Sequence, residues 1–102
     1  MDRDAIIATL RSRQAELKAL GAVSLSLFGS TARGEASGRS DIDLAVTFDP
    51  ASMPRGFYYI GRLEELRERL EAVLGQPVDL VPEPVEKQRF QQEIDQDRVR
   101  AF

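Results

Sequence analysis

Acidic and small polar residues at a fixed spacing are the part of this sequence that could carry out chemistry. Asp41 and Asp43 alternate within one short segment, and Gly29 and Ser30 precede them by about ten residues. In an extended strand, residues i and i+2 project from the same face, which brings the two carboxylates together. Close carboxylates repel each other, and each raises the pKa of the other unless a cation lies between them. The segment therefore predicts a site for a hard metal ion, with Mg²⁺ as the natural candidate.

A third carboxylate, Asp79, lies in the short apolar segment PVDLVP. If this segment forms the strand next to that of Asp43 and turns its apolar side chains to the core, Asp79 faces the same side as the first two carboxylates. Three carboxylates on one face suit a transfer with two metal ions, which clamp the attacking and leaving oxygens. We expect Asp41, Asp43 and Asp79 to hold two Mg²⁺ ions, and Asp79 to assist deprotonation of an incoming hydroxyl.

The segment that begins at Gly29 predicts a phosphate site. A strand pattern ends at Gly29, and the following STARGEA can form one or two helical turns whose free N–H groups hold phosphate. Gly29 allows phosphate to approach the backbone closely, and the Ser30 hydroxyl can donate to a phosphate oxygen. Arg33, about one helical turn further, can meet the same polyphosphate or an acidic group of a partner. A nucleoside triphosphate would then lie between this turn and the metal ions.

The composition excludes several kinds of enzyme. The 102 residues include no cysteine and no histidine, which excludes zinc thiolate sites, thiol nucleophiles and Ser-His-Asp mechanisms. A net charge of -3 argues against nucleic-acid binding through bulk charge. The sequence contains no apolar run of membrane-spanning length and no signal-peptide core at its N-terminus. These features, with the lack of cysteine, predict a cytoplasmic protein.

Apolar periodicity predicts one domain over residues 1–102, in which helices and strands alternate. The expected elements are helices over 4–20, 57–74 and 84–94 and strands over 22–29, 41–48 and 77–82. Gly21 and Gly75 are expected to end the first two helices, and Pro84 to begin the last one. The final RVRAF fits either a continued helix or a short edge strand. This order predicts an α/β fold, with a small sheet and helices packed on it.

Several other residues have structural explanations. Asp49 precedes a proline and fits a turn at the end of a strand, whereas Arg39 fits a solvated loop. The charged run over 64–71 fits an exposed helix face with i,i+4 pairs. Tyr58 and Tyr59 could stack on a nucleotide base, but we expect them in the core.

The string FGSTARGEASGRSDIDLAV, over residues 28–46, resembles the signature of the DNA-polymerase-β-like nucleotidyltransferase superfamily, and most of all its minimal nucleotidyltransferase (MNT) domain proteins. The resemblance extends over nearly the whole chain. It implies a small mixed β-sheet flanked by helices, and Mg²⁺-dependent transfer of a nucleoside monophosphate from a triphosphate with release of pyrophosphate. By matching positions, Gly29 and Ser30 would bind phosphate, Asp41 and Asp43 would bind both metal ions, and Asp79 would be the third acidic residue.

The resemblance also implies a partner. Larger members use a separate domain to contact the acceptor, and this chain shows none, so we expect the acceptor on another molecule. Stand-alone proteins of this kind are similar to the antitoxins of type VII (HEPN/MNT) toxin–antitoxin pairs. The resemblance therefore implies transfer of AMP from ATP to a tyrosine of a HEPN ribonuclease toxin, which silences the toxin.

Three alternatives remain open. The chain could neutralise a partner by binding and occlusion alone, or it could transfer a nucleotide to a small molecule such as an aminoglycoside. It could also extend RNA or DNA, which the acidic balance and the lack of a basic strip disfavour. The base preference, the modified residue and the oligomeric state do not follow from the sequence.

Overall fold

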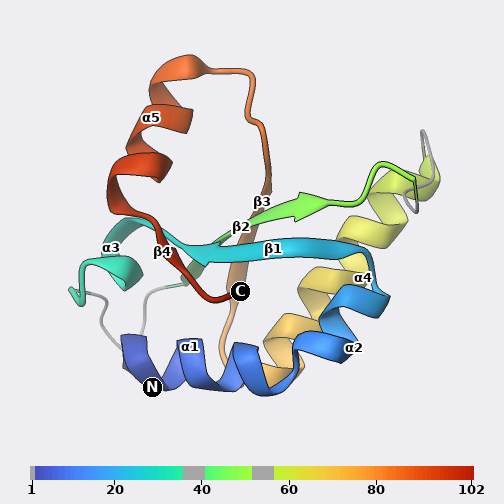
Figure 1. The fold of residues 1–102 in the computed structure, drawn as a ribbon, viewed down its shortest axis with the longest axis horizontal. Helices are drawn as coiled ribbons and strands as arrows, with labels where there is room; N and C mark the ends of the chain where they lie inside the picture. Colours follow the sequence, from blue (N-terminus) through green and yellow to red (C-terminus); the bar gives the residue numbers. More distant parts are fainter. Residues whose placement is uncertain (1, 36–40, 52–56) are drawn as a thin grey trace.

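A mixed β-sheet with helices on both faces forms the centre of the computed structural model, which describes residues 2–35, 41–51 and 57–102 (Figure 1). The described elements are α1 (Arg3–Ser12), α2 (Gln14–Ala19), β1 (Ala22–Leu27), α3 (Gly29–Ala32), β2 (Ile42–Phe48), α4 (Phe57–Leu74), β3 (Val78–Pro82), α5 (Gln88–Asp97) and β4 (Val99–Arg100). The strand order is β3-β2-β1-β4, in which β2 and β3 run parallel while β1 is antiparallel to β2 and β4. The predicted α/β architecture, a small mixed sheet flanked by helices, is confirmed.

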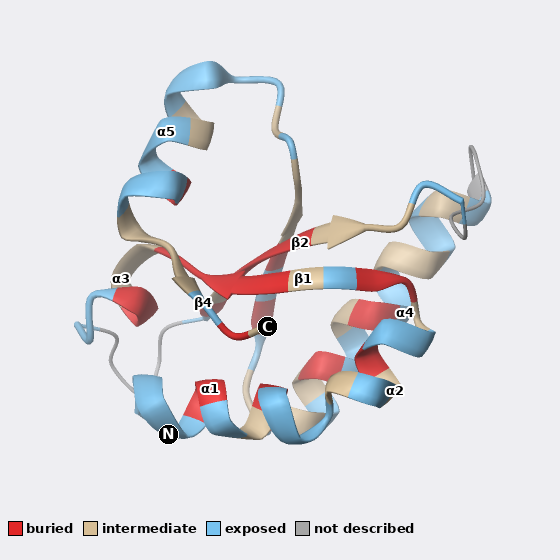
Figure 2. Ribbon diagram, in the orientation of Figure 1, coloured by how far each residue is buried: buried red, intermediate tan, exposed pale blue. Residues whose placement is uncertain are grey.

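The two faces of the sheet differ in what covers them. α1, α2 and α4 lie together on one face, where their buried side chains meet those of the sheet, and α5 lies on the other (Figures 1 and 2). β2 alternates between the faces as predicted: Ile42, Leu44 and Val46 join the main core, whereas Ala45 joins a small second cluster with Ile94 of α5. This alternation leaves the second face of β2 available to polar side chains.

Helix α4 has the predicted bounds, but its first turn is less buried than expected. Leu66, Leu70 and Leu74 are buried in the core, while Ile60 is 62% exposed and Tyr58 is 79% exposed. The expectation that Tyr58 lies in the core is therefore wrong, and the apolar Ile60 of the same turn is exposed as well. Figure 1 shows the reason, because the start of α4 lies beyond the tip of β2 and has no sheet to cover.

Tyr59, the other tyrosine of this turn, packs against Phe48 of β2. The rings of Tyr59 and Phe48 meet edge to face, with centroids 5.9 Å apart, and Tyr59 is half-buried.

None of the described helices has the length and apolar character needed to cross a membrane.

The helix expected over residues 4–20 is divided at Arg13. The Arg13 N–H donates to the Leu10 carbonyl at 3.1 Å, one residue short of the α-helical pattern. The carbonyl of Thr9, which a regular helix would bond to Arg13, instead accepts the Ser12 hydroxyl at 2.6 Å. The division allows both helices to face the core, because Leu10 of α1 and Leu17 of α2 are each fully buried.

The start of β1 departs from simple alternation. Val23 alternates with serine along the sequence, as Leu25 and Leu27 do, but it is 48% exposed, and Ala22 is buried in its place. A register shift between Ala22 and Ser24 explains the difference, since a bulge moves one residue out of the pleat. Nearby, Asp49 accepts a hydrogen bond from the Ala51 N–H at 3.0 Å, which confirms the predicted turn at the end of β2.

The last helix begins later than predicted. α5 starts at Gln88, and Pro84 lies in the preceding loop after a cis peptide bond with Glu83. The Gln91 side chain accepts the Val85 N–H at 2.9 Å, which holds this loop in a non-helical conformation. The ambiguous C-terminal segment forms β4, which pairs with the end of β1.

A polar cluster anchors α5 to the sheet. Arg98 directly follows α5 and donates to the buried Ser26 hydroxyl at 3.0 Å and to Glu83 Oε1 at 2.9 Å, with a second contact between Arg98 and Glu83. The Glu83 side chain is only 9% exposed. A bidentate Arg–carboxylate pair of this kind fixes orientation, because both groups are planar forks. It ties the end of α5 to β1 and to the loop after β3.

Replacement of Arg98 with Met should lower the free energy of unfolding by about 3 kcal/mol, because it leaves the Glu83 carboxylate buried without its counterion. Urea denaturation followed by circular dichroism measures the loss. Glu83→Gln in the same background should recover part of it, since a neutral amide costs less to bury. A loss below about 0.5 kcal/mol, the range of ordinary surface changes, would contradict this account of the anchor.

Candidate active site

Two of the three predicted carboxylates lie at paired positions of neighbouring strands. Asp43 of β2 and Asp79 of β3 are partners in the register of these parallel strands, so both project from the face opposite the main core. Asp43 is half-buried and Asp79 is exposed. Asp41 is also exposed and lies immediately before β2. The structure therefore brings together the strand positions that the sequence suggested, while their chemical roles stay predictions.

Negative charge accumulates at Asp43. Burial raises the pKa of the Asp43 carboxyl, the charges of Asp79 and Asp41 raise it further, and the charge of Arg33 lowers it. Burial disfavours the ionised form because the carboxylate loses contact with water. This end of the sheet thus holds a carboxylate whose ionised form is disfavoured unless a cation compensates it.

The donor set fits Mg²⁺ in chemistry. Within residues 2–35, 41–51 and 57–102, no three acidic, histidine or cysteine side chains are gathered tightly enough to form a metal site as they stand. Asp43 and Asp79 nevertheless supply oxygen ligands from paired positions, with Asp41 at the same end of β2. Such a set suits a hard cation that takes one or two carboxylates and completes its shell with phosphate and water.

Gly29 lies against the Asp43 carboxylate. Its φ is +63°, in the left-handed region, and a Cβ at this position would lie 2.6 Å from Asp43 Oδ2. The Phe28 N–H donates to the Asp43 carbonyl at 3.1 Å, which ties the two segments together. Only glycine allows this conformation and this approach at once, so the Gly-Ser turn and the aspartate form one structural unit.

The turn predicted after Gly29 is the short helix α3. Ser30 is half-buried in its first turn, and the Ser30 carbonyl accepts the Glu35 N–H at 2.9 Å. The neighbouring Thr31 is buried, and its hydroxyl has no hydrogen-bond partner among the described residues. Ser30 is thus placed beside Gly29, as the phosphate prediction requires, and its contact with phosphate stays a prediction.

Arg33 has protein partners that the sequence did not indicate. Its NH1 group donates to Asp97 Oδ2 at 2.6 Å, and its Nε–H donates to Glu35 Oε2 at 3.0 Å. Asp97 ends α5, 64 residues along the chain, so only the packing of α5 beside α3 reveals the pair. Arg39, expected in a solvated loop, lies outside the described residues.

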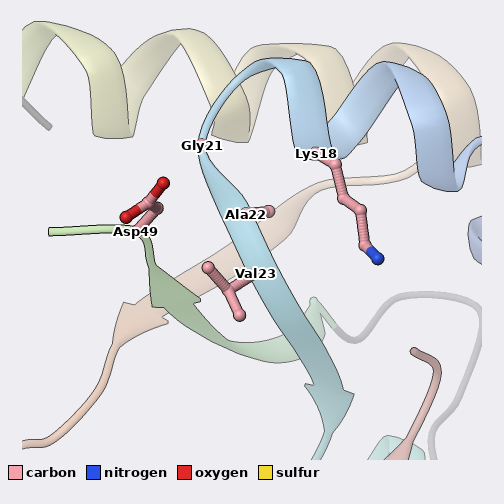
Figure 3. A pocket seen from close by; sticks show the side chains of 5 residues that line it. All are labelled: Lys18, Gly21, Ala22, Val23 and Asp49. Atoms are coloured by element: carbon pink, nitrogen blue, oxygen red, sulfur yellow. The ribbon is translucent and has the colours of Figure 1, made fainter. Parts of the chain in front are cut away.

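The described surface also has a shallow pocket away from the carboxylates. It has a volume of about 240 Å³ and is lined by Lys18, Gly21, Ala22, Val23 and Asp49 (Figure 3). Figure 3 shows it at the start of β1, between the end of α2 and the turn that follows β2. It coincides with the bulge that exposes Val23, and none of the predicted site residues lines it.

Two paired carboxylates beside a Gly-Ser turn, on a small mixed sheet, define a minimal nucleotidyltransferase architecture. The family model for the nucleotidyltransferase domain matches residues 8–101, and the chain belongs to this family. Over 77 residues it is 40% identical to the protein adenylyltransferase MntA of Thermococcus cleftensis, a match that covers 74% of this chain and 72% of the relative.

A second relative, from Methanocaldococcus jannaschii, is also named as a protein adenylyltransferase and is 48% identical over 58 residues. That match covers 57% of this chain and 54% of the relative, so it spans about half of the relative's length.

Solved structures share the fold. A structure described as a minimal nucleotidyltransferase has a TM-score of 0.78 and 31% identity, and the match covers 97% of this chain and 95% of the other. A complex of the tri-AMPylated HEPN toxin of Shewanella oneidensis with its MNT antitoxin has a TM-score of 0.62 and 20% identity, over 94% of this chain and 71% of the other. At that identity the second likeness concerns the fold alone.

Gly29→Ala should lower the free energy of unfolding by about 1–2 kcal/mol through its left-handed backbone and should also displace the Asp43 carboxylate. The matched control is Gly75→Ala, where φ is +70° but a Cβ would meet nothing within 4 Å. Urea denaturation and binding of a nonhydrolysable ATP analogue measure the two effects. Both variants should lose stability, but only Gly29→Ala should lose binding. Unchanged binding by Gly29→Ala would show that the close approach to Asp43 is unimportant.

Asp43→Asn should stabilise the metal-free protein at neutral pH. The pKa of Asp43 is raised in the folded chain, so stability falls as the pH rises through that pKa, and the ionised carboxylate stays unfavourable above it. An amide cannot ionise and avoids this cost. Thermal unfolding in a chelator should show a higher midpoint for the variant at pH 7, and the difference should shrink toward pH of about 4, near the ordinary pKa of aspartate. The exposed Glu86→Gln is the matched control, and a lower midpoint for Asp43→Asn at pH 7 would refute the expectation.

Proposed function

We propose that this chain is a protein adenylyltransferase that moves AMP from ATP to a tyrosine of a HEPN ribonuclease toxin, and that it acts as the antitoxin of a type VII pair. The observation that carries the proposal is the pairing of Asp43 with Asp79 beside Gly29, within a chain of the nucleotidyltransferase family. The names of the two relatives support protein adenylylation. The complex of an AMPylated HEPN toxin with an MNT antitoxin of the same fold supports the partner.

The turn at Gly29 would hold the triphosphate. Gly29 has no side chain to keep phosphate from the backbone, and the Ser30 hydroxyl would donate to a phosphate oxygen. Arg33 would add a charge-assisted contact through its guanidinium. Asp41, Asp43 and Asp79 would hold Mg²⁺, which when bound neutralises the charge of the phosphates and lowers the pKa of an oxygen that it ligates.

Asp79 would act as the base. It is exposed, so the hydroxyl of another molecule can reach it, and in this chain no histidine can take that role. Asp79 would accept the proton of the tyrosine hydroxyl while the tyrosine oxygen forms a bond to the α-phosphorus of ATP. The bond from that phosphorus to the bridging oxygen breaks, and pyrophosphate leaves with the electron pair. The Ser30 hydroxyl would stabilise the charge that develops on the leaving phosphates.

The exposure of Asp41 and Asp79 suits an acceptor that arrives on another protein, because a large molecule must approach the open end of the sheet. ATP and a ribonuclease toxin that acts on cellular RNA meet in the cytoplasm, and the proposal places the reaction there. The net charge of -3 makes direct nucleic-acid binding unfavourable.

The test is the double variant Asp41→Asn and Asp43→Asn. The assay combines labelled ATP, Mg²⁺ and a cognate HEPN protein, to be sought in the adjacent reading frame, with intact mass of the toxin as the readout. The variant should lower AMP transfer at least about 100-fold, since it removes two charges that act in the transition state. Thermal unfolding should show an intact fold, and Glu86→Gln with Glu93→Gln removes the same charge from exposed sites as a control.

Transfer by the double variant at the wild-type rate would overturn the proposal. Neutralisation of the toxin by the double variant, or without ATP and Mg²⁺, would instead establish binding and occlusion as the mechanism. Label transferred to a small-molecule acceptor, and none to the toxin, would establish a different substrate.

A further inference from the structure

An ion pair between α3 and α5 lies beside the candidate site and is not explained by the proposed reaction. Arg33 directly follows α3, and Asp97 is the last residue of α5. The Arg33 NH1 group donates to Asp97 Oδ2 at 2.6 Å, and its Nε–H donates to Glu35 Oε2 at 3.0 Å. The two carboxylates therefore hold the guanidinium from two of its nitrogens, which restricts its plane.

Arg33 is mechanically joined to the Gly-Ser turn. The Arg33 backbone N–H donates to the Gly29 carbonyl at 3.2 Å, so the single turn of α3 links the two residues. Whatever holds the Arg33 side chain thus also sets where positive charge lies relative to the Gly29–Ser30 turn.

The guanidinium keeps donors for a ligand. It carries five N–H groups, and its bonds within the described part of the chain use one at Nε and one at NH1. Both N–H groups of NH2 have no partner among the described residues and can donate to a phosphate oxygen. The Arg33 side chain is 46% exposed, so solvent and ligands can reach it. Asp97 therefore holds the arginine and leaves its NH2 group available to a ligand.

Asp97 is itself held firmly. The next residue, Arg98, is anchored to Glu83 and Ser26, and Ile94 one turn earlier is buried against Phe28 and Ala45. These contacts attach the end of α5 to the sheet on the face that carries Asp43 and Asp79. Figure 1 shows α5 and α3 next to each other at this end of the molecule, in agreement with their contacts.

We propose that Asp97 is a positioning residue for nucleotide binding. It holds the Arg33 guanidinium beside the Gly29–Ser30 turn, so that the side chain is already ordered before the triphosphate binds. The inference rests on the proposed function, because it assumes that this turn receives a nucleoside triphosphate. A long arginine side chain loses much conformational freedom when it binds phosphate, and a pre-formed ion pair removes part of that cost.

The direction in which nucleotide affinity changes distinguishes a positioning role of Asp97 from a purely electrostatic effect of its charge. Asp97 is negative and lies near the expected place of a polyanion, so removal of its charge should tighten nucleotide binding if the charge acts only through space. Removal should weaken binding if the carboxylate instead holds Arg33 in place. Asp97→Asn keeps the shape of the side chain and removes its negative charge.

The experiment measures the Kd of a nonhydrolysable ATP analogue by calorimetry, and the KM for ATP and kcat with the HEPN protein. Asp97→Asn should raise both Kd and KM about three- to tenfold, as expected for a lost contact in a coupled pair, with kcat changed less than about twofold. Asp97→Glu, which keeps the charge, should recover most of the affinity. Glu93→Gln removes the same charge from an exposed position of α5 and should leave the Kd unchanged.

A double-mutant cycle tests whether Asp97 acts through Arg33. Arg33→Gln should weaken binding at least as much as Asp97→Asn, and the double variant should bind no more weakly than Arg33→Gln alone. Thermal unfolding of each variant checks that α5 stays docked, which the separate anchor at Arg98 favours.

Unchanged or tighter binding by Asp97→Asn would overturn the inference, as would additive losses in the cycle. These results would leave the proposed function standing, provided that the wild-type protein binds the analogue. A wild-type protein that neither binds the analogue nor transfers AMP would overturn both.

Discussion

Repulsion between paired carboxylates is the constraint on which the rest of the structure depends. The register of β2 and β3 places Asp43 opposite Asp79, and burial adds to the cost of ionising Asp43. A fold gains no stability from this arrangement. It persists because the opposite face of the same strands supplies Ile42, Leu44 and other apolar side chains to the main core. The apolar face stabilises the sheet, and the acidic face is then free to bind what the carboxylates attract.

One face of the sheet builds the main core and the other carries the acidic residues, which explains how a small chain can hold such a site. α1, α2 and α4 cover the apolar face, while α5 attaches to the other face through a small cluster around Ile94 and through the Arg98–Glu83 pair. α5 thus covers part of that face and leaves Asp79 exposed. Polar anchors suit this position, because they hold the helix in one orientation with few apolar contacts.

Much of the candidate site followed from local pattern. Alternation over residues 41–48 correctly divided β2 between its faces, and the single acidic residue of the short third strand proved to be the partner of Asp43. The patterns misled where packing overrides them. Val23 is exposed because of a bulge, and Ile60 is exposed because the sheet ends before α4 does. The helix α5 begins later than predicted because a local hydrogen bond holds the preceding loop. None of these causes is a property of the residue itself.

The sequence alone determined the residue types, the strand periodicity and the Gly-Ser turn, because each depends on neighbours within a few positions. Gly29 is one example, since its left-handed backbone follows from local geometry. The tertiary structure alone decided that its missing side chain makes room for the Asp43 carboxylate. It also decided that Arg33 meets Asp97 across 64 residues. Contacts between distant segments depend on how whole elements pack, and the spacing of residues along one segment carries no record of that packing.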